Sequence, residues 1–547
     1  MKKYFNIISL SSSSNLITLF SFLVLFCMPV LSQQEENKSK PLELPNFIIE
    51  GKEQLNIRSG IKQSPEIPDP MTAKELDSLN SLRKEQSLLL PPEQLPTSII
   101  SRNYMKGYLG ADLGRFSVIN AYGGYESNKD EYTFFGDAGY SHSSGHVKNS
   151  GYNIFKVNMA TDYIAPEKFW IFGGSKTRSQ IRFNNSNYNL YSNLDSLGNS
   201  PARDAMNLDL SIDSDGNYEG FQFSTGATLK TLQLYNKADK GFDNCLKGYL
   251  SVKNLWSQYE AGAAASVDIH GVHGSKAHFI QLNAFGTYAK DKYLLKLTAG
   301  FQLAQNSTGA EKGGLLLSAN GEYRFDKLLT FKAQILSGLE NNSYFELFRS
   351  NPYLKSNADI DYIYNALLMK GIAYYHPNES IGLSAGIEFG QQNNVPVYED
   401  SSDGSFAVCY SKINKIEISF EGFWLITHED ELTARFGLSY SSLSENSKLL
   451  PYHAPLSLSV IYKRTWFDNI GTKIGLNFIG SRYTDKLNTE AKKLNSTADL
   501  IIGADYSFNN NFRAYFDATN LLNSNIIVWR GYKEWGLFIS LGLLYQF

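Results

Sequence analysis

The last thirteen residues of the chain, 535–547, alternate between two kinds of side chain and constrain the fold more than any other stretch. Successive side chains of a β-strand point to opposite faces, so every second residue shares a face. The apolar face consists of Trp535, Leu537, Ile539, Leu541, Leu543, Tyr545 and Phe547, and the other of Gly536, Phe538, Ser540, Gly542, Leu544 and Gln546. A half-buried strand of a soluble protein could show this apolar face. A chain that stops on it is typical of the strand that closes a barrel in a membrane.

The stretch before it repeats the alternation and places charges on the second face. Between 497 and 520, apolar side chains alternate with Asp499, Asp505, Arg513 and Asp517. A core packed between two sheets excludes such charges because an isolated ion is costly to remove from water, whereas a water-filled lumen accepts them. The sequence therefore predicts an all-β protein, a transmembrane antiparallel β-barrel.

The period of two begins near Tyr104 and predicts about 22 strands, within a range of roughly 16 to 22. Two polar insertions, 184–217 and 340–361, are expected to be long loops. Short turns are expected at the periplasmic end and longer loops outside, but the long segment 391–404 breaks this alternation. The predicted strands are 104–112, 115–125, 131–142, 151–163, 168–183, 217–230, 247–257, 260–270, 275–288, 291–305, 313–325, 328–340, 361–376, 380–391, 404–411, 414–427, 431–443, 456–463, 473–478, 497–508, 512–520 and 535–547.

Composition excludes two other classes of protein. Mean hydropathy is −0.28, and no run of about 18 apolar residues follows the N-terminal region, which excludes a helical membrane protein. The formal net charge of −3 provides no basic surface for nucleic acid. The 34 Tyr, 34 Phe and 43 Gly instead suit aromatic girdles at two membrane interfaces and small residues facing a lumen.

Residues 1–32 have the features of a secretory signal peptide. Two lysines follow Met1, an apolar run covers 16–31, and small residues near Ser32 suit cleavage after it. An uncleaved membrane anchor is the alternative. A lipoprotein is disfavoured because Phe26, just before Cys27, is too large for the cleavage motif.

Residues 33–100 differ in composition from the barrel region, 101–547. Eight of the 16 prolines lie between Pro41 and Pro96, and Glu, Ser and Lys dominate. Such a segment cannot bury enough apolar surface to fold alone, so a mostly irregular periplasmic segment is expected. Residues 72–88 have the spacing of one amphipathic helix, which either enters the barrel or docks on a periplasmic partner, or remains solvated.

The side chains that could act in catalysis or metal binding form no recognisable site. No catalytic, cofactor-binding or metal-binding residue is therefore predicted. The histidine groups are expected to be solvated loop residues, not metal ligands, and the two cysteines of the mature chain are expected to be unpaired. Charges on the predicted inner face either define a permeation path or pair with one another along a wet lumen. The residues are His142, His146, His270, His273 and His278; Cys245 and Cys409; and Glu417, Glu421, Arg435, Asp499, Asp505 and Arg513.

The C-terminal region resembles the final strands of TonB-dependent receptor barrels. The resemblance rests on Tyr506-Ser-Phe508, on Asn520-Leu-Leu-Asn523, and on a last strand that ends in Tyr545-Gln-Phe547. It implies about 22 strands and a folded plug inside the lumen. Only Gln33–Ile100 is available for a plug, with the wrong composition, and no TonB box is evident. The chain is therefore similar to a TonB-dependent receptor of the Bacteroidetes type that lacks the plug.

The expected function is solute or glycan transport across the bacterial outer membrane, by a protein exported through its signal peptide. The alternative is a non-conducting scaffold subunit of an outer-membrane complex for secretion or barrel assembly. An enzyme is not expected, and no cofactor is. The expected partners are outer-membrane lipid and other outer-membrane or periplasmic proteins, without nucleic acid.

Overall fold

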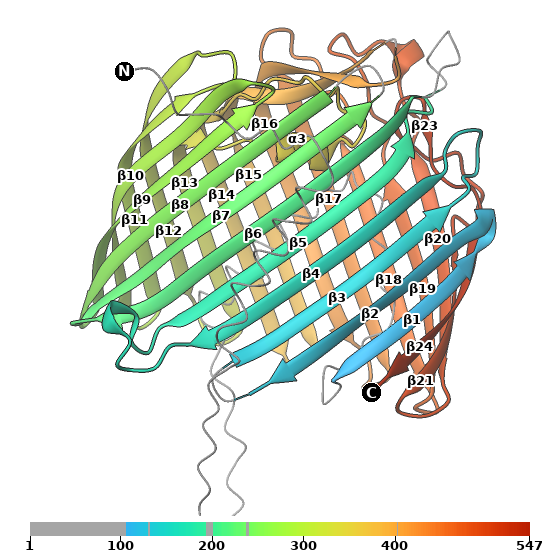
Figure 1. The fold of residues 1–547 in the computed structure, drawn as a ribbon, viewed down its shortest axis with the longest axis horizontal. Coiled ribbons are helices and arrows are strands. Elements are labelled where there is room, and N and C mark those ends of the chain that lie inside the picture. Colours follow the sequence, from blue (N-terminus) through green and yellow to red (C-terminus); the bar gives the residue numbers. More distant parts are fainter. Residues whose placement is uncertain (1–105, 130–131, 193–200, 237–239, 402) are drawn as a thin grey trace, which may run out of the picture. The chain divides into compact units, whose positions relative to one another are not determined.

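A closed antiparallel β-barrel of 22 strands makes up the part of the chain that the computed structural model describes (Figure 1). These are residues 106–129, 132–192, 201–236, 240–401 and 403–547. Each of the 22 strands pairs with the barrel strands that come before and after it in the sequence, so the sheet is a simple meander. The predicted signal peptide, 1–32, and the predicted periplasmic segment, 33–100, with its helix at 72–88, lie outside the described residues.

The barrel closes between its first and last strands. Strand β1 (Gly107–Gly114) pairs with β2 (Val118–Asn128) on one side and with β24 (Phe538–Gln546) on the other. Strand β24 also pairs with β21 (Phe512–Thr519). The backbone N–H groups of Lys106 and Gly107 donate to the carbonyl of Phe547, at 2.8 and 2.9 Å. Closure leaves no sheet edge open, which a β-structure in lipid requires.

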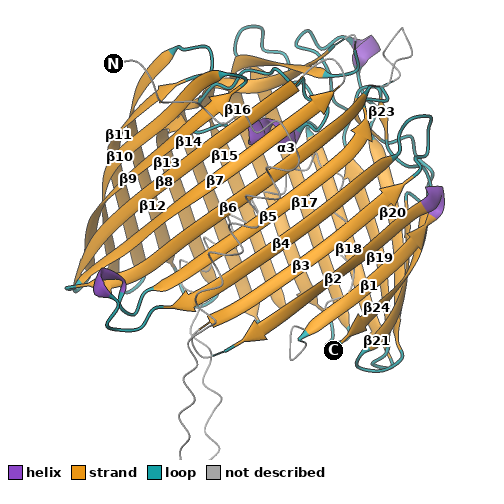
Figure 2. Cartoon of the chain, in the orientation of Figure 1, coloured by secondary structure: helices purple, strands orange, loops and turns teal. Residues whose placement is uncertain are grey.

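Helices are few and short (Figure 2). A separate two-stranded sheet, β22 (Ile527–Trp529) with β23 (Tyr532–Lys533), lies in the last connection. The other strands are β3 (Tyr132–Ser143), β4 (Tyr152–Ile164), β5 (Lys176–Asn189), β6 (Ala202–Tyr218), β7 (Phe221–Asn236), β8 (Lys240–Trp256), β9 (Tyr259–Val272), β10 (Ser275–Lys290), β11 (Tyr293–Gln305), β12 (Glu311–Arg324), β13 (Leu329–Glu340), β14 (Ile363–Asn378), β15 (Ile381–Asp400), β16 (Phe406–Leu425), β17 (Asp430–Leu443), β18 (Leu456–Trp466), β19 (Ile470–Ile479) and β20 (Thr497–Ser507). The helices are η2 (Arg115–Ser117), η3 (Trp170–Phe172), α3 (Tyr344–Ser350) and η4 (Glu490–Lys492).

The two faces of the strands differ as the alternation predicts. On β24, Leu541 and Leu543 are 63% and 51% exposed, whereas Leu544, the next residue on the opposite face, is buried. On β11, Phe301 is 70% exposed and its neighbour Gln302 only 1%. The outer face is thus an exposed apolar surface, and polar side chains lie inside. Among the described residues, no helix is long and apolar enough to cross a membrane.

Connections at the two ends of the barrel differ in length. At one end, which we call the short-turn end, most strands are joined by a few residues, such as 219–220 and 508–511. At the other, the long-loop end, the connections include 341–362, 480–496 and 520–537. Both ends of the barrel sequence, Gly107 and Gln546, lie at the short-turn end because they are paired with each other's strands. The expected short and long connections near the C-terminus therefore fall on opposite ends.

The predicted strand number is correct because two errors cancel. The polar insertion 184–217 is wrong as a loop: β5 continues into it and β6 occupies its second half. The inner face of β6 is entirely polar over Asn207, Asp209 and Ser211, so its few outer aliphatic residues did not stand out.

The second error divided one strand into two. The predicted strands 404–411 and 414–427 are both parts of β16, which is continuous over 20 residues. Its partner β15 is equally long and does not end at 391. A bulge between Gln392 and Val395, with Asn394 at a φ of 57°, interrupts the period of two there. This explains why 391–404 did not fit the alternation of short and long connections.

The predicted last strand is also too long at its start. Strand β24 begins at Phe538, and Trp535 lies in the preceding connection. The indole of Trp535 packs on Phe538, with ring centroids 4.4 Å apart, and stacks on Tyr152 of β4. These contacts hold it at the rim of the barrel instead of on the outer face.

Candidate functional site

The inner wall of the barrel carries ion pairs between neighbouring strands. Arg178 of β5 forms two hydrogen bonds, at 2.6 and 2.8 Å, with the carboxylate of Asp162 on β4. Lys415 of β16 lies between Glu388 and Glu417, at 2.9 and 3.1 Å. Each pair joins residues that face inward in the strand register. Such pairs in a protein interior indicate a wet, polar lumen.

The six inner-face charges predicted from the sequence fall into two groups. Glu417, Glu421 and Arg435 lie on β16 and β17, where Arg435 is 4.0 Å from Glu421. The remaining three lie on β20 and β21, namely Asp499, Asp505 and Arg513. Arg513 is 3.8 Å from Asp505, and Asp499 accepts a hydrogen bond from the backbone N–H of Asn520. Five of the six therefore have a charged partner on the wall, with Lys415 serving Glu417, as the interpretation of mutually paired lumen charges predicts, whereas Asp499 is held by a backbone N–H.

The longest connection of the described barrel, residues 341–362, folds back against the mouth at the long-loop end, and we call it the α3 loop. Its helix α3 begins with a capping box, in which the side chains of Ser343 and Glu346 each accept a backbone N–H of the other residue. Tyr344 and Leu347 of the helix are almost completely buried. Burial of one such apolar side chain contributes roughly 1.5–3 kcal/mol, so these two residues hold the loop against the inside of the barrel.

A second long connection, residues 520–537, contains the β22–β23 hairpin, and we call it the β22–β23 loop. Its Tyr532 is fully buried, and its ring stacks on Tyr353 of the α3 loop with centroids 3.5 Å apart. The Tyr532 hydroxyl donates to the carbonyl of Gly404, between β15 and β16, at 2.6 Å. The two loops are thereby joined to each other and to the connection between β15 and β16.

One apolar cluster connects these two loops, together called the cap, to strands from β6 to β16. Because the cluster includes inner-face residues from well-separated strands, the cap lies across the mouth of the barrel, with α3 at this end in Figure 1. Its members are Ala205, Leu232, Leu234, Val272, Ala277, Tyr344, Leu347, Leu354, Ala358, Ile360, Tyr398, Phe406, Tyr452, Leu494, Trp529 and Tyr532.

A fully buried arginine fixes the tip of the α3 loop. Arg203 of β6 donates from Nη1 to the carbonyls of Pro352 and Leu354, at 3.1 and 2.6 Å. Its Nε donates to Asn236 of β7 at 3.0 Å. Hydrogen bonds from a charged donor are each stronger than neutral ones. The guanidinium thus joins the loop to the barrel wall.

Charged and polar contacts fix the β22–β23 loop in the same way. Arg530 is 2.7 Å from the carboxylate of Asp400, at the end of β15, and Tyr452 donates to the same carboxylate at 2.6 Å. Arg482 is also buried and donates to the carbonyl of Ile527. Burial lowers the pKa of the Arg482 guanidinium.

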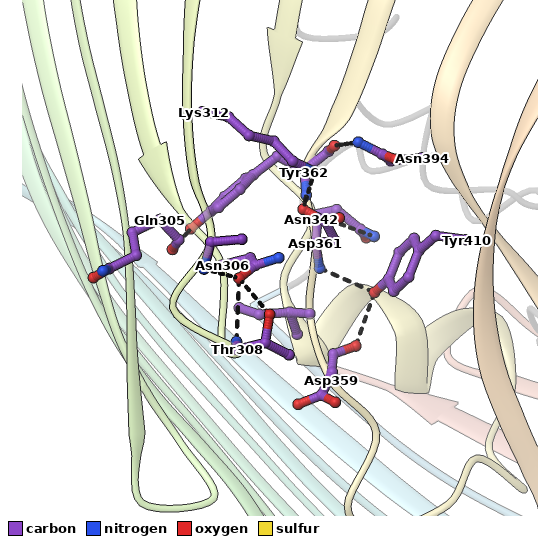
Figure 3. A network of polar contacts seen from close by, with 12 residues as sticks. Gln305, Asn306, Thr308, Lys312, Asn342, Asp359, Asp361, Tyr362, Asn394 and Tyr410 are labelled. Carbon is purple, nitrogen blue, oxygen red and sulfur yellow. Dashed lines mark hydrogen bonds and ion pairs between the residues drawn. The ribbon is translucent and has the colours of Figure 1, made fainter.

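The return end of the α3 loop is held by the polar network in Figure 3. Tyr410 of β16 accepts the backbone N–H of Asp361 at 3.0 Å and donates to the carbonyl of Asp359 at 2.8 Å. Lys312 of β12 pairs with the Asp361 carboxylate. Tyr362 donates to the backbone of Gln305 on β11. The loop is therefore anchored on both sides of its root.

The histidines lie at separate places and have different surroundings. His142 is on β3 beside Asn153, and His146 contacts the carbonyl of Lys533 at 2.7 Å. His273, in the β9–β10 turn, accepts from the backbone of Phe242 through Nδ1 and contacts the carbonyl of Ala358 through Nε2. His273 therefore also ties the α3 loop to the wall. In the described part of the chain, no group of metal-ligating side chains is placed to hold an ion.

The expectation of solvated loop histidines is wrong for His270, which faces inward on β9 and is 1% exposed. His278 lies on β10 directly after Ala277, the register partner of His270, so its side chain points to the opposite face of the sheet. Cys245 on β8 and Cys409 on β16 are both free thiols. Spacing in the sequence had grouped His270 with His273 and His278, but pairing between strands groups it with β8 instead.

Sequence reasoning missed the cap because its contacts join residues far apart in the chain. Arg203 and Leu354, for instance, are separated by 151 positions. The one available signal was the concentration of aromatic residues in polar connections, such as Tyr344, Tyr353, Trp529 and Tyr532. Aromatic side chains in an external loop indicate a loop that packs on something.

The architecture defines a class of protein by its fold: a 22-stranded barrel with a polar lumen and a folded cap. No family model matches the sequence, and no curated protein is similar to it. Solved structures do match, and they share the barrel of TonB-dependent receptors, so the resemblance is confirmed at the level of the fold.

Three of these structures illustrate the match. The FrpB iron transporter from Neisseria meningitidis has a TM-score of 0.63 at 8% identity, over 81% of each chain. The copper transporter OprC has a TM-score of 0.61 at 11% identity, over 81% of each chain. The ferric yersiniabactin uptake receptor FyuA from Yersinia pestis has a TM-score of 0.60 at 9% identity, over 81% of this chain and 80% of the receptor. At such low identity the likeness concerns the fold alone.

Proposed function

We propose that the protein is an outer-membrane transport barrel whose outer mouth is closed by the cap in the resting state. The chain is exported through residues 1–32 and carries no plug domain. Its cargo is a small solute or a glycan. The apolar outer face, the charged inner wall and the likeness in fold to iron and copper transporters support this proposal. Orientation follows from the short-turn end, which in bacterial barrels faces the periplasm.

The observation that carries the proposal is the cap anchored over a polar lumen. A channel that only leaks needs no buried core across its mouth, and a polar lumen below that core provides a path for solute once the core is displaced. The two together fit a gated pathway. Polar anchors such as Arg203 and Arg530 hold the gate, since hydrogen bonds of this kind can exchange for water when a ligand or partner displaces the loops.

A non-conducting scaffold subunit of a secretion or barrel-assembly complex is the second candidate. The same cap favours it, because Tyr344, Phe406 and Tyr532 form a dry cluster that blocks the mouth. In this case the cap is a permanent lid, and its outer surface is where another protein binds. The two candidates therefore differ in whether the cap opens.

Conductance in planar lipid bilayers distinguishes them. For a gated transporter, the wild-type protein should be closed most of the time with brief openings. Arg203→Ala should increase the open fraction at least about tenfold, because a loss of roughly 1.5–3 kcal/mol in charged hydrogen bonds corresponds to that factor or more. Arg182→Ala is the matched control: Arg182 also faces inward but is half exposed, 3.9 Å from Asp209, and should leave gating unchanged.

If neither the wild type nor Arg203→Ala conducts, and an outer-membrane or periplasmic protein co-purifies, the scaffold function is favoured. Deletion of Gln33–Ile100 is the companion experiment. If this segment occupies the lumen, its removal should raise conductance only in the background of Arg203→Ala, where the cap is already loosened. Steady, ungated conductance of the wild type would contradict the proposed role of the cap.

A further inference from the structure

Three side chains on the inner wall of β8 and β9 have the arrangement of an activated thiol. Cys245 of β8 lies opposite His270 of β9 in the register, and Asp243 is two residues before Cys245 on the same face. The Nδ1 atom of His270 is 3.1 Å from Oδ1 of Asp243, and its Nε2 atom is 3.6 Å from Sγ of Cys245. The imidazole therefore lies between the carboxylate and the thiol.

The position of the imidazole between the carboxylate and the thiol determines which ring nitrogen carries a proton and which one can accept the thiol proton. A carboxylate beside Nδ1 accepts the Nδ1–H bond, which leaves Nε2 to take the proton of the thiol, and it stabilises the imidazolium that results. The side chains of His270 and Asp243 are 0% and 2% exposed. Because both stand on paired strands and not on loops, their geometry is fixed before any reagent arrives.

We propose that Cys245 is a reactive thiol and a modification site for small peroxides, with His270 as its base and Asp243 as a positioning residue. Nε2 of His270 takes the thiol proton, and Sγ attacks one oxygen of the peroxide. A sulfur–oxygen bond forms as the oxygen–oxygen bond breaks, and the leaving oxygen takes the proton back from His270. The thiol is oxidised to a sulfenic acid and the peroxide is reduced to water or an alcohol.

The small exposed fraction of Cys245 limits the size of the molecules that can reach its sulfur atom. Cys245 is 7% exposed, which admits a molecule as small as hydrogen peroxide and excludes bulky electrophiles. The other cysteine of the described residues, Cys409, lies on β16 and is a separate free thiol. The sulfenic acid thus has no second described cysteine beside it with which to form a disulfide.

Two buried oxygen atoms without a donor lie further along the same wall, beyond the Cys245–His270 pair, where Asp268 is opposite Lys247 and 3.7 Å from it. Asp268 is the next inward-facing residue of β9 beyond His270, and its Oδ1 atom is buried without a hydrogen-bond donor. Asn341, at the start of the α3 loop, donates to the other oxygen of Asp268, while its own Oδ1 atom is likewise buried and unpaired. A sulfenic acid at Cys245 would add an O–H donor to this part of the wall, from which Asn341 leads into the α3 loop.

The test compares the two thiols within one folded protein. The folded full-length barrel is treated with hydrogen peroxide, the peroxide is removed, and the protein is then unfolded in the presence of a 1,3-dione reagent that traps sulfenic acid, so that access of the trap is equal at both sites; the peptides of Cys245 and Cys409 are quantified by mass spectrometry. Although Cys245 is the less exposed thiol, it should react at least about tenfold faster, because the thiolate is the reactive form. His270→Gln should remove this advantage, and Asp243→Asn should reduce it. Cys409→Ser is the control and should leave the rate at Cys245 unchanged.

Burial alone makes the opposite prediction, since it would render Cys245 slower than Cys409. Such a result, or an unchanged rate at Cys245 in a folded His270→Gln variant, overturns the proposal. Gel mobility before and after heating reports whether each variant has folded. If His270→Gln does not fold, the comparison of the two cysteines in the wild type decides the matter without it.

Discussion

Glu534 follows β23 in the β22–β23 loop and lies close to Tyr152, Tyr191 and Tyr353. Burial raises the pKa of its carboxyl from 4.5 to about 7. The docked loop therefore favours the neutral acid. Below pH 4.5 the carboxyl is neutral whether the loop is docked or not, so it does not affect the free energy of docking. Between pH 4.5 and about 7 the undocked loop gains stability by ionising, so docking becomes less favourable as pH rises. Above about pH 7 this unfavourable contribution is fully present. The cap should consequently be held more firmly in acid.

Hydrogen exchange of the amides in 527–533, corrected for the intrinsic rate, measures this effect. Protection should decrease between pH 5 and pH 7.5 in the wild type and stay level in Glu534→Gln. His146 contacts the carbonyl of Lys533, and burial lowers the pKa of His146 below 6.5, so His146→Asn is needed as a control and should keep the wild-type trend. A pH dependence that survives in Glu534→Gln would show that another group is responsible.

At the scale of the strand, adjacent residues have opposite environments. Leu297 on β11 is 52% exposed on the outer face, whereas Thr298 faces inward opposite Phe285 and Ser318. A cationic side chain at the middle of the lipid-facing belt costs about 2–4 kcal/mol, but one in a wet lumen costs little.

Leu297→Arg should therefore lower the free energy of unfolding in lipid vesicles by about 2–4 kcal/mol, and Thr298→Arg should change it by much less. Urea titrations of tryptophan fluorescence in vesicles measure both. The pair differs by one position and carries the same new charge, so length and net charge are matched. Equal destabilisation by the two substitutions would mean that the outer face does not contact lipid.

How far the sequence predicts this structure also differs from strand to strand. β11 and β24 are evident because large apolar residues alternate with small or polar ones along most of their length. Strand β6 is not evident from the sequence, because its inner face is polar and the connection next to it is rich in Asn and Ser. β16 appears divided at Ser411, Lys412 and Asn414, where the strand has left the apolar belt and the alternation no longer carries information.

The cap and the buried thiol could not be predicted, because both depend on register. Cys245 and His270 are 25 positions apart, and only the pairing of β8 with β9 brings them together. Tyr353 and Tyr532 are joined across the mouth through packing that no local pattern specifies. Periodicity indicates which face a residue lies on, whereas the closure of the sheet determines its neighbours.

At the scale of the whole molecule, stability depends on the seam between β1 and β24. Deletion of residues 538–547 leaves β1 and β21 as two open edges, whose unpaired backbone groups cost several kcal/mol each in a lipid environment. The truncated chain should therefore form no compact barrel in detergent or vesicles. Gel mobility before and after heating reports this, with wild-type protein as the folded reference.

A truncated chain that still resists unfolding would mean that the remaining strands can close without β24. A milder variant tests the same seam. Gly542 of β24 lies where an added Cβ would clash with the ring of Tyr515 on β21, whose hydroxyl donates to Asp112 of β1, so Gly542→Val should weaken closure without removing any backbone hydrogen bond.

The two 20-residue strands, β15 and β16, are about twice as long as a membrane crossing requires. At about 3.4 Å per residue and a tilt near 45°, they reach on the order of 20 Å past the hydrocarbon layer on the side of the cap. In the proposed orientation this hairpin stands above the lipid and packs against the cap, since Tyr398 and Phe406 near its tip belong to the buried apolar cluster. The length of the two strands thus sets the height at which the cap sits, and a peptide inserted at their connection should loosen the cap because Gly404 and Asp400 bind the β22–β23 loop there.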